Sequence, residues 1–203
     1  MPAAPPFSRR ALLKLAASAA LLPALRPVAA RAESGRPDFD MVFPQDPRFT
    51  EFVSSFGFAR SGGRRHQGND LMAPKMTPVF AAADGVVVEV EDGGTAGRRV
   101  VIDHGRGFET WYLHLNNDTP GTDDGQADWS ETVMPNVTKN RLVKAGEQIA
   151  WVGDSGNAES VGSHTHFELH YQGAAIDPYP YLKAAFDRDL RAFFRVADSL
   201  GLL

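Results

Sequence analysis

The stretch His164-Thr165-His166-Phe167-Glu168-Leu169-His170-Tyr171 decides most of what the sequence predicts. Histidine or glutamate alternates in it with other side chains, which is the period of a β-strand that has one face in the core. In a strand, side chains two residues apart point to the same face, about 6 to 7 Å apart. We therefore expect His164 and His166 on one face, while Phe167 and Leu169 face the core.

Two earlier segments also contain histidines. They are His66-Gln67-Gly68-Asn69-Asp70 and Trp111-Tyr112-Leu113-His114-Leu115. Gly68 frees φ, which would let His66 and Asp70 converge through an irregular entry into a strand. Two imidazoles and one carboxylate form the ligand set that holds catalytic zinc with a fourth position open, although other divalent ions accept the same donors. One His-x-His pair is weak evidence for a metal, whereas three such segments in one chain are stronger evidence.

The region from Phe52 to Tyr171 is predicted to be an antiparallel sheet. Its apolar or alternating runs are short, and the gaps between them are too short for helical crossovers. We expect strands at 52–58, 69–72, 79–82, 85–91, 99–103, 109–115, 148–153 and 164–171. After Pro178, apolar residues spaced by three and four predict a C-terminal amphipathic helix at about 180–200, packed on the sheet rather than lying in a membrane interface. The predicted fold class is mainly β, with a single antiparallel, sandwich-like sheet.

One connection, 116–143, is unusually long for a compact domain. Loops beyond about 12 to 15 residues are uncommon unless they are functional or disordered. The segment begins two residues after His114, so we hypothesise that it forms one wall of a substrate groove, with Trp129 as the contact. The alternative is a solvated surface insertion. Because no candidate ligand lies within it, replacing residues 117–139 with a short Gly-Ser linker is expected to leave the fold and the metal site intact while changing which peptides are cleaved.

The composition excludes several classes of protein. The chain has 203 residues, of which 43% are hydrophobic and none is cysteine, so one domain without disulfides, thiolate nucleophiles or iron–sulfur clusters is expected. Beyond residue 32 the chain carries 16 basic and 25 acidic residues. Binding to a phosphate backbone needs clustered Lys and Arg, so we expect no nucleic-acid partner.

Residues 1–32 have the pattern of a signal peptide. Arg9, Arg10 and Lys14 precede a short apolar run that ends in a small-x-small motif, and this run is too short to span a bilayer. Ser-Arg-Arg-x-Leu-x-Lys is similar to a twin-arginine signal, with an ordinary secretory leader as the alternative. We expect an exported, periplasmic or secreted chain that begins near Glu33 and keeps no stable membrane anchor.

From about Val53 to Leu182 the chain resembles the lysostaphin and LytM-type zinc endopeptidases, which cut peptidoglycan peptides. The resemblance depends on several ordered motifs, which are Ser55-Phe56-Gly57, His66-Gln67-Gly68-Asn69-Asp70, Ala73-Pro74, Ala83-Asp84-Gly85-Val86-Val87, Tyr112-Leu113-His114-Leu115, Val152-Gly153-Asp154-Ser155-Gly156 and His164-Thr165-His166-Phe167-Glu168. It implies a LytM-type domain at 33–203 with a groove that holds one zinc ion per chain. It also implies that His66, Asp70 and His166 ligate the zinc, and that His114 and His164 are catalytic.

The resemblance leaves some alternatives open. A non-catalytic regulator of the same fold would bind and activate another cell-wall hydrolase, but such members characteristically lose metal ligands. We leave His104, in a turn signature, and His170, about 13 Å beyond His166 along the strand, outside the site. Tyr112 either lines the groove or packs in the core. The sequence predicts neither the bond that is cut nor the oligomeric state.

Overall fold

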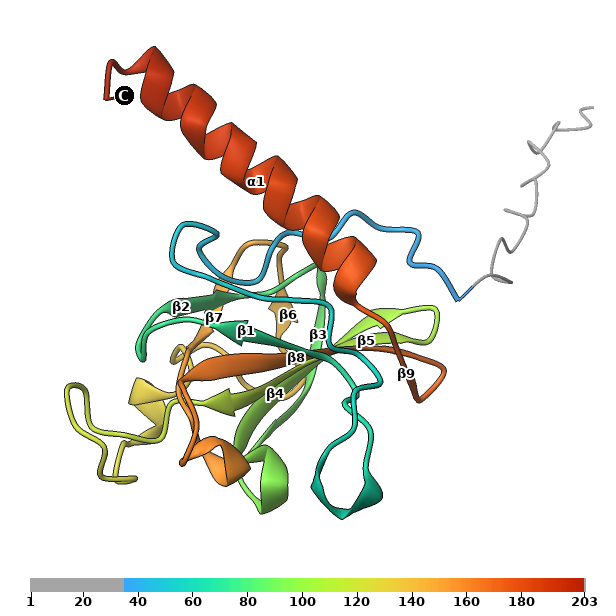
Figure 1. Cartoon of the computed structure of the whole chain (residues 1–203), viewed down its shortest axis with the longest axis vertical. Coiled ribbons are helices and arrows are strands. Elements are labelled where there is room, and N and C mark those ends of the chain that lie inside the picture. The colour runs from blue at the N-terminus through green and yellow to red at the C-terminus, as the bar shows by residue number, and fades with distance from the viewer. Residues whose placement is uncertain (1–34, 203) are drawn as a thin grey trace, which may run out of the picture. The chain divides into compact units, whose positions relative to one another are not determined.

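The computed structural model describes residues 35–202, and the predicted signal peptide at 1–32 lies outside the described residues (Figure 1). The helices and strands of the described part are, in chain order, η1 (Ser61–Gly63), β1 (Asn69–Met72), β2 (Pro78–Phe80), β3 (Gly85–Glu91), η2 (Gly94–Ala96), β4 (Arg98–Gly105), β5 (Phe108–Leu115), η3 (Trp129–Glu131), β6 (Leu142–Val143), β7 (Gln148–Trp151), η4 (Gly156–Ala158), β8 (His164–Tyr171), β9 (Ala174–Ile176) and α1 (Tyr179–Ser199), where η is a 3-10 helix. The fold is mainly β, as the sequence predicts.

The main sheet has seven strands and is antiparallel throughout. Its order is β1-β8-β5-β4-β3-β6, β9 also pairs with β8, and β2 pairs with β7 in a separate two-stranded sheet. Strand β8 therefore lies between β1 and β5, and His166 stands opposite Asp70 on one side and Leu113 on the other. This register brings the three histidine-bearing segments of the sequence to one region of the sheet.

The alternation predicted for β8 is confirmed. Phe167 and Leu169 are fully buried in a core that joins both sheets to the start of α1. His164 and His166 lie on the opposite face and are also buried, with exposed fractions of 6% and 8%. Because burying unpaired polar groups is costly, these histidines must be satisfied by specific partners.

The strand predicted at 52–58 is wrong. No residue of this segment belongs to a strand, and isolated bridges only flank it, Glu51 with Met72 and Ala59 with Arg65. Gly57 has a φ of 78°, a left-handed conformation that interrupts an extended run. The segment is instead a loop that leads into His66.

The predicted helix is confirmed as α1, and its first half packs more closely on the domain than its second half, where Ala197 is nevertheless buried and the Arg48 guanidinium lies 4.3 Å from the Phe193 ring centroid. Leu182 and Ala185 are buried and the Phe186 ring lies 5.1 Å from that of Phe43, whereas Phe194 and Leu200 are 47% and 65% exposed. Figure 1 shows the second half of the helix extending past the strands. Within residues 35–202, no helix is long and apolar enough to cross a membrane.

The long connection at 116–143 is partly ordered into secondary structure. It contains η3 and β6, and Val133 and Val137 are 6% and 2% exposed within the core. The backbone N–H of Trp151 donates to the carbonyl of Thr132 at 3.0 Å. The expectation that residues 117–139 could be replaced by a short linker without affecting the fold is therefore wrong, because Val133 and Val137 contribute to the core.

Candidate metal centre and neighbouring histidines

The sheet register and one loop bring His66, Asp70 and His166 together. Asp70 in β1 and His166 in β8 are directly opposite each other. His66 precedes β1, and its backbone is held by reciprocal loop hydrogen bonds, from Gly57 N–H to its carbonyl at 2.8 Å and from its N–H to the Phe58 carbonyl at 2.9 Å. The centre is therefore positioned by backbone hydrogen bonds on both sides.

Gly68 is needed at this point for space rather than for an unusual φ. A Cβ at Gly68 would lie 2.1 Å from the carbonyl oxygen of Phe167, and the residue is not among those with positive φ. A side chain would push the segment away from β8. Gly68 is therefore required, as the sequence predicts, but the physical reason is the close approach of two backbones and not a freed φ.

Three acceptor atoms converge in this centre. Asp70 Oδ1 lies 3.0 Å from His66 Nε2 and 2.8 Å from His166 Nδ1, and the two ring nitrogens are 2.9 Å apart. The other nitrogen of each ring is already used, because His66 Nδ1 donates to the Ser55 carbonyl at 3.0 Å and His166 Nε2 donates to Glu168 Oε1 at 2.8 Å. Neutral rings in these tautomers direct two nitrogen lone pairs and one carboxylate oxygen at the same point.

The donor chemistry of this group suits a cation such as zinc. Acceptors this close repel one another unless positive charge lies between them, and two imidazoles with one carboxylate are a common zinc set. A proton on one of these ring nitrogens can also supply the positive charge, and the pKa values show its effect: burial would raise the pKa of Asp70, yet hydrogen bonds from protonated His166 and His66 hold that pKa well below its usual range. Burial would lower the pKa of His166, but hydrogen bonds to Asp70 and Glu168 raise it. The cluster thus stabilises positive charge at this point.

Glu168 connects the centre to His170, another buried histidine of the same strand. Its Oε1 accepts from His166, and its Oε2 lies 2.5 Å from His170 Nε2. The His170 ring in turn stacks on Trp111 with 4.7 Å between centroids and 12° between planes. Burial alone would raise the pKa of Glu168, but hydrogen bonds to both histidines lower it to about 2, which keeps it anionic.

Sequence analysis missed the role of Glu168, although the pattern contained it. His164, His166, Glu168 and His170 all occupy alternate positions of one strand and so share a face. A carboxylate that accepts from the outer nitrogen of a ligating histidine fixes the tautomer and orientation of the ring. His170, which we left outside the site, is therefore two hydrogen bonds away from the centre rather than unconnected to it.

His114 and His164 lie beside the metal centre with their outer nitrogens occupied. His114 Nδ1 donates to the Ser155 carbonyl and His164 Nδ1 donates to the Gly162 carbonyl, both at 2.8 Å. Their ring centroids are 5.1 Å apart, and that of His114 is 5.9 Å from His166. Because a backbone carbonyl can only accept, each Nδ1 carries the proton and each Nε2 keeps a lone pair.

Burial also determines the protonation of these two rings. Burial, with His164 and His166 nearby, lowers the pKa of His114 to about 4. Burial likewise lowers the pKa of His164, even though Asp70 Oδ1 lies 3.7 Å from its Nε2. Both rings are thus neutral near pH 7, which is the form that accepts a proton.

A left-handed backbone at His114 turns its side chain toward the centre. Alternation along β5 would place His114 on the same face as Tyr112, yet Tyr112 and Leu115 are both fully buried in the core. His114 has a φ of 59°, uncommon for a non-glycine residue and concentrated at functional sites. The Tyr112 hydroxyl accepts from the Ala82 N–H at 2.8 Å, so Tyr112 packs in the core instead of lining a groove.

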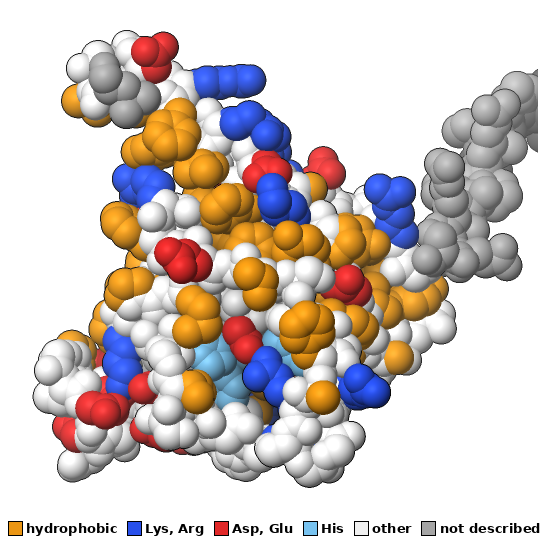
Figure 2. All heavy atoms as spheres, viewed as in Figure 1, with side chains coloured by type: hydrophobic (Ala, Val, Ile, Leu, Met, Phe, Trp, Pro, Cys, Tyr) orange, Lys and Arg blue, Asp and Glu red, His pale blue; other side chains and the backbone are white. Residues whose placement is uncertain are grey.

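The first half of the 116–143 connection is anchored beside His114. Lys75 Nζ lies 2.6 Å from Asp118 and Asp123 and 2.8 Å from Asp154, the residue before Ser155. Asn117 Nδ2 donates to Glu159 Oε1 at 2.7 Å. Figure 2 shows histidine side chains recessed on one face of the molecule, with charged side chains around them. This half of the connection therefore lies at the edge of the candidate centre.

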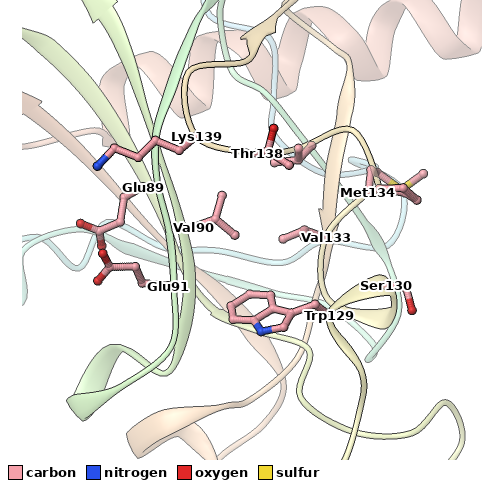
Figure 3. A pocket seen from close by; sticks show the side chains of 11 residues that line it. Glu89, Val90, Glu91, Trp129, Ser130, Val133, Met134, Thr138 and Lys139 are labelled. Carbon is pink, nitrogen blue, oxygen red and sulfur yellow. The ribbon is translucent and has the colours of Figure 1, made fainter.

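The second half of the connection faces a different cavity. Trp129 lines an apolar cavity of about 400 Å³ together with Val90 and Val133, whose side chains point toward each other in Figure 3. The Arg98 guanidinium lies 5.0 Å from the Trp129 ring centroid. The prediction that Trp129 contacts substrate at the centre has no support in this arrangement.

Comparison with known proteins agrees with this geometry. Residues 64–127 match the family model described as Peptidase family M23. An uncharacterized metalloprotease of Haemophilus influenzae is 37% identical over 116 residues, covering 57% of this chain and 20% of the relative. The DD-carboxypeptidase/endopeptidase Mpg of Neisseria meningitidis is 34% identical over 134 residues, covering 64% and 26%. The chain thus aligns with only about a quarter or less of the length of these two relatives.

Solved structures give the same result. LytM of Ruminococcus gnavus superimposes with a TM-score of 0.58 at 27% identity, covering 73% of this chain and 61% of that one. The catalytic domain of lysostaphin from Staphylococcus simulans gives 0.52 at 27% identity, covering 66% and 92%. A zinc-containing peptidase from Vibrio cholerae gives 0.54 at 28% identity, covering 68% and 39%. Residues 64–127 thus match peptidase family M23, and the fold is similar to that of lysostaphin and LytM, as the resemblance in the sequence implies.

Proposed function

We propose that this protein is an exported, zinc-dependent endopeptidase that hydrolyses peptide stems or cross-bridges of peptidoglycan. The observation that carries the proposal is the convergence of His66, Asp70, His166, His114 and His164 in one buried centre. Each ring has its outer nitrogen hydrogen-bonded and its inner nitrogen directed into the site. Such preorganisation is costly to build, and it is what transition-state stabilisation needs.

His66 Nε2, His166 Nδ1 and Asp70 Oδ1 would hold the zinc ion. When bound, zinc in such a site acts as a Lewis acid that polarises the scissile carbonyl and makes a water molecule more acidic. The chain contributes a fixed donor geometry, since Ser55 and Glu168 hold the two rings from outside. It also limits the contact of the imidazole rings with bulk water, because all four histidines of the site are less than 9% exposed.

His114 and His164 would move the protons of the reaction. Each presents a neutral Nε2 that can accept the proton released by the attacking water and return it to the leaving amine. The same groups, once protonated, would stabilise negative charge on the carbonyl oxygen. We expect the two residues to share these roles.

We propose that the substrate is a crosslink peptide of the D-Ala to meso-diaminopimelate type rather than a pentaglycine bridge. One relative is named a DD-carboxypeptidase/endopeptidase, and another, the peptidoglycan DD-endopeptidase ShyB of Vibrio cholerae, is 31% identical over 140 residues. Residues 117–126 border the centre and would form one wall of the groove that selects the peptide.

We further propose that residues 1–32 are a cleaved signal peptide of the twin-arginine type and that 33–203 form the peptidase domain. Support comes from the basic, apolar and small-x-small pattern at 1–32. A peptidoglycan substrate requires export. Mass spectrometry of the N-terminus from a periplasmic fraction would test the cleavage site near Glu33.

The alternative function, a non-catalytic regulator of another hydrolase, has less support. A regulator needs neither three convergent acceptor atoms nor two further histidines with free inner nitrogens. Here all five side chains are present, and their geometry is mutually consistent. The complete site therefore favours the enzyme.

Digestion of purified sacculi tests the proposed function. The zinc-loaded protein should release crosslink-cleaved muropeptides that mass spectrometry can identify, and H66A should release none. The exposed residue Arg64 in the same loop supplies a matched control, R64A, which should act like the wild type. Intact crosslinks after prolonged digestion of several sacculus chemotypes, with zinc bound, would contradict the endopeptidase proposal and favour the regulator.

A further inference from the structure

Arg60 gives the two oxygens of Asp70 different roles. Asp70 Oδ1 faces His66 and His166, whereas Asp70 Oδ2 accepts a hydrogen bond from Arg60 Nη2 at 2.5 Å. The Arg60 side chain is 43% exposed and that of Asp70 is 23% exposed, so this ion pair lies at the mouth of the buried centre. Sequence analysis assigned no role to Arg60.

The loop that holds His66 also fixes Arg60. The Arg60 N–H donates to the Arg64 carbonyl at 3.0 Å, and Ala59 pairs with Arg65 across the loop. Gly62, at the tip, has a φ of 70°, which lets the chain reverse between these partners. Arg60 and His66 therefore lie on opposite arms of one hydrogen-bonded hairpin, and the guanidinium is placed over Asp70 by the same backbone that places the imidazole.

The ion pair between Arg60 and Asp70 matters because a carboxylate can ligate a metal with one oxygen or with two. If Asp70 Oδ2 were free, a small rotation of the carboxylate could turn it toward the metal position. A second oxygen would occupy space that the open fourth position of a catalytic site requires. The planar guanidinium, with donors in a fixed fork, is well suited to hold one carboxylate oxygen in place.

We infer that Arg60 is a positioning residue that restricts Asp70 to one-oxygen ligation and so keeps a coordination position open for substrate. The inference rests on the proposed function, since it assumes that His66, Asp70 and His166 hold a metal. It assigns Arg60 no direct contact with the reacting atoms. Its effect is on the geometry of the centre, and its positive charge works against metal affinity at the same time.

Cobalt substitution tests this inference with a readout other than activity. Four-coordinate Co²⁺ absorbs visible light more strongly than five-coordinate Co²⁺. The wild type and R64A should give the strong four-coordinate spectrum, R60A should give a weaker five-coordinate one, and R60K should give an intermediate spectrum because its ammonium can still reach Asp70 Oδ2. Arg64 is the matched control because its guanidinium hydrogen-bonds within its own turn, to the Ser61 carbonyl at 3.2 Å.

Zinc affinity, measured by chelator competition, completes the test. Loss of a residue that hydrogen-bonds a metal ligand typically weakens metal binding 10- to 100-fold. In R60A, loss of the positive charge that repels the metal offsets part of this effect. We therefore expect zinc affinity to fall about 10-fold or less. Unchanged cobalt spectra in R60A, with the fold intact by circular dichroism, would overturn the inference about Arg60. Failure of the wild type to bind either metal, with H66A as the reference for a disrupted site, would instead overturn the proposed function.

Discussion

The floor of the candidate site and its wall are built in different ways. The floor is formed by β1, β8 and the end of β5, where strand register fixes Asp70 opposite His166. The wall at 117–126 is held by side-chain ion pairs at its root, centred on Lys75, and most of its residues are exposed. On the proposed function, the comparison teaches that the chemistry would be placed in the rigid sheet and the choice of substrate in a segment that can change without altering the sheet.

The largest effect is expected from removing a metal ligand in the floor. D70A or H166A should abolish hydrolysis of sacculi and the binding of zinc, because two donors do not hold the ion in a catalytic geometry. Assay of released muropeptides, with zinc content measured on the same samples, checks this. Hydrolysis at the wild-type rate by a zinc-free D70A would contradict the account.

Replacing a histidine of the floor that is not a ligand should separate binding from catalysis. H114A and H164A should keep zinc but lose roughly 10²- to 10⁴-fold in turnover, the range for loss of general acid–base catalysis. Zinc content and kcat are the two measurements. Loss of zinc in H164A equal to that in H166A would show that the ligand is assigned to the wrong histidine.

A smaller effect is expected behind the floor, at Glu168. E168Q removes the negative charge that fixes the His166 ring, so zinc affinity should fall by about 10- to 100-fold. Chelator competition measures the affinity, and E109Q provides a control on the same sheet, since Glu109 bonds only Trp111 among the described side chains. An affinity within twofold of the wild type would mean that the ring orientation does not depend on this charge.

The smallest effect on chemistry is expected from the wall. Replacing residues 119–125 with a short Gly-Ser linker should alter which muropeptides are cut. Zinc binding should not change, because the flanking residues are already held together by the Ala127 N–H, which donates to the Asn117 carbonyl at 2.8 Å. W129A, in the second half of the connection, should leave the cleavage pattern unchanged. Identical product profiles from the wild type and the shortened protein would show that the wall does not select substrate.

The alternation of side chains along a strand correctly predicted which residues face the floor of the site and which face the core, wherever the strands are regular. It placed His164 and His166 on one face and Phe167 and Leu169 in the core, because a strand in a sheet has only one way to present alternating side chains. It could not predict the direction of His114, since the left-handed φ of that residue is imposed by its tertiary surroundings. It also overestimated the extended character of 52–58, where Gly57 turns the chain.

Contacts between segments that are distant in the chain were the second feature that could not be predicted from the sequence. The pairing of Arg60 with Asp70 depends on a hairpin closed by hydrogen bonds that no local pattern reveals. The place of Trp129 depends on which strand the long connection returns to, and it returns to β3 rather than to the metal centre. The candidate ligands and catalytic histidines, which the structure brings together, were thus easier to find in the sequence than the residues that position them.

Zinc-edge X-ray absorption of the purified protein tests the central claim most directly. The account predicts one zinc per chain with two imidazole nitrogens and one carboxylate oxygen at about 2.0 to 2.2 Å. The imidazole scattering should fall by half in any zinc that H166A retains. A zinc ion with one imidazole or none in the wild type, or a spectrum unchanged in H166A, would contradict the assignment of His66, Asp70 and His166 as the ligand set.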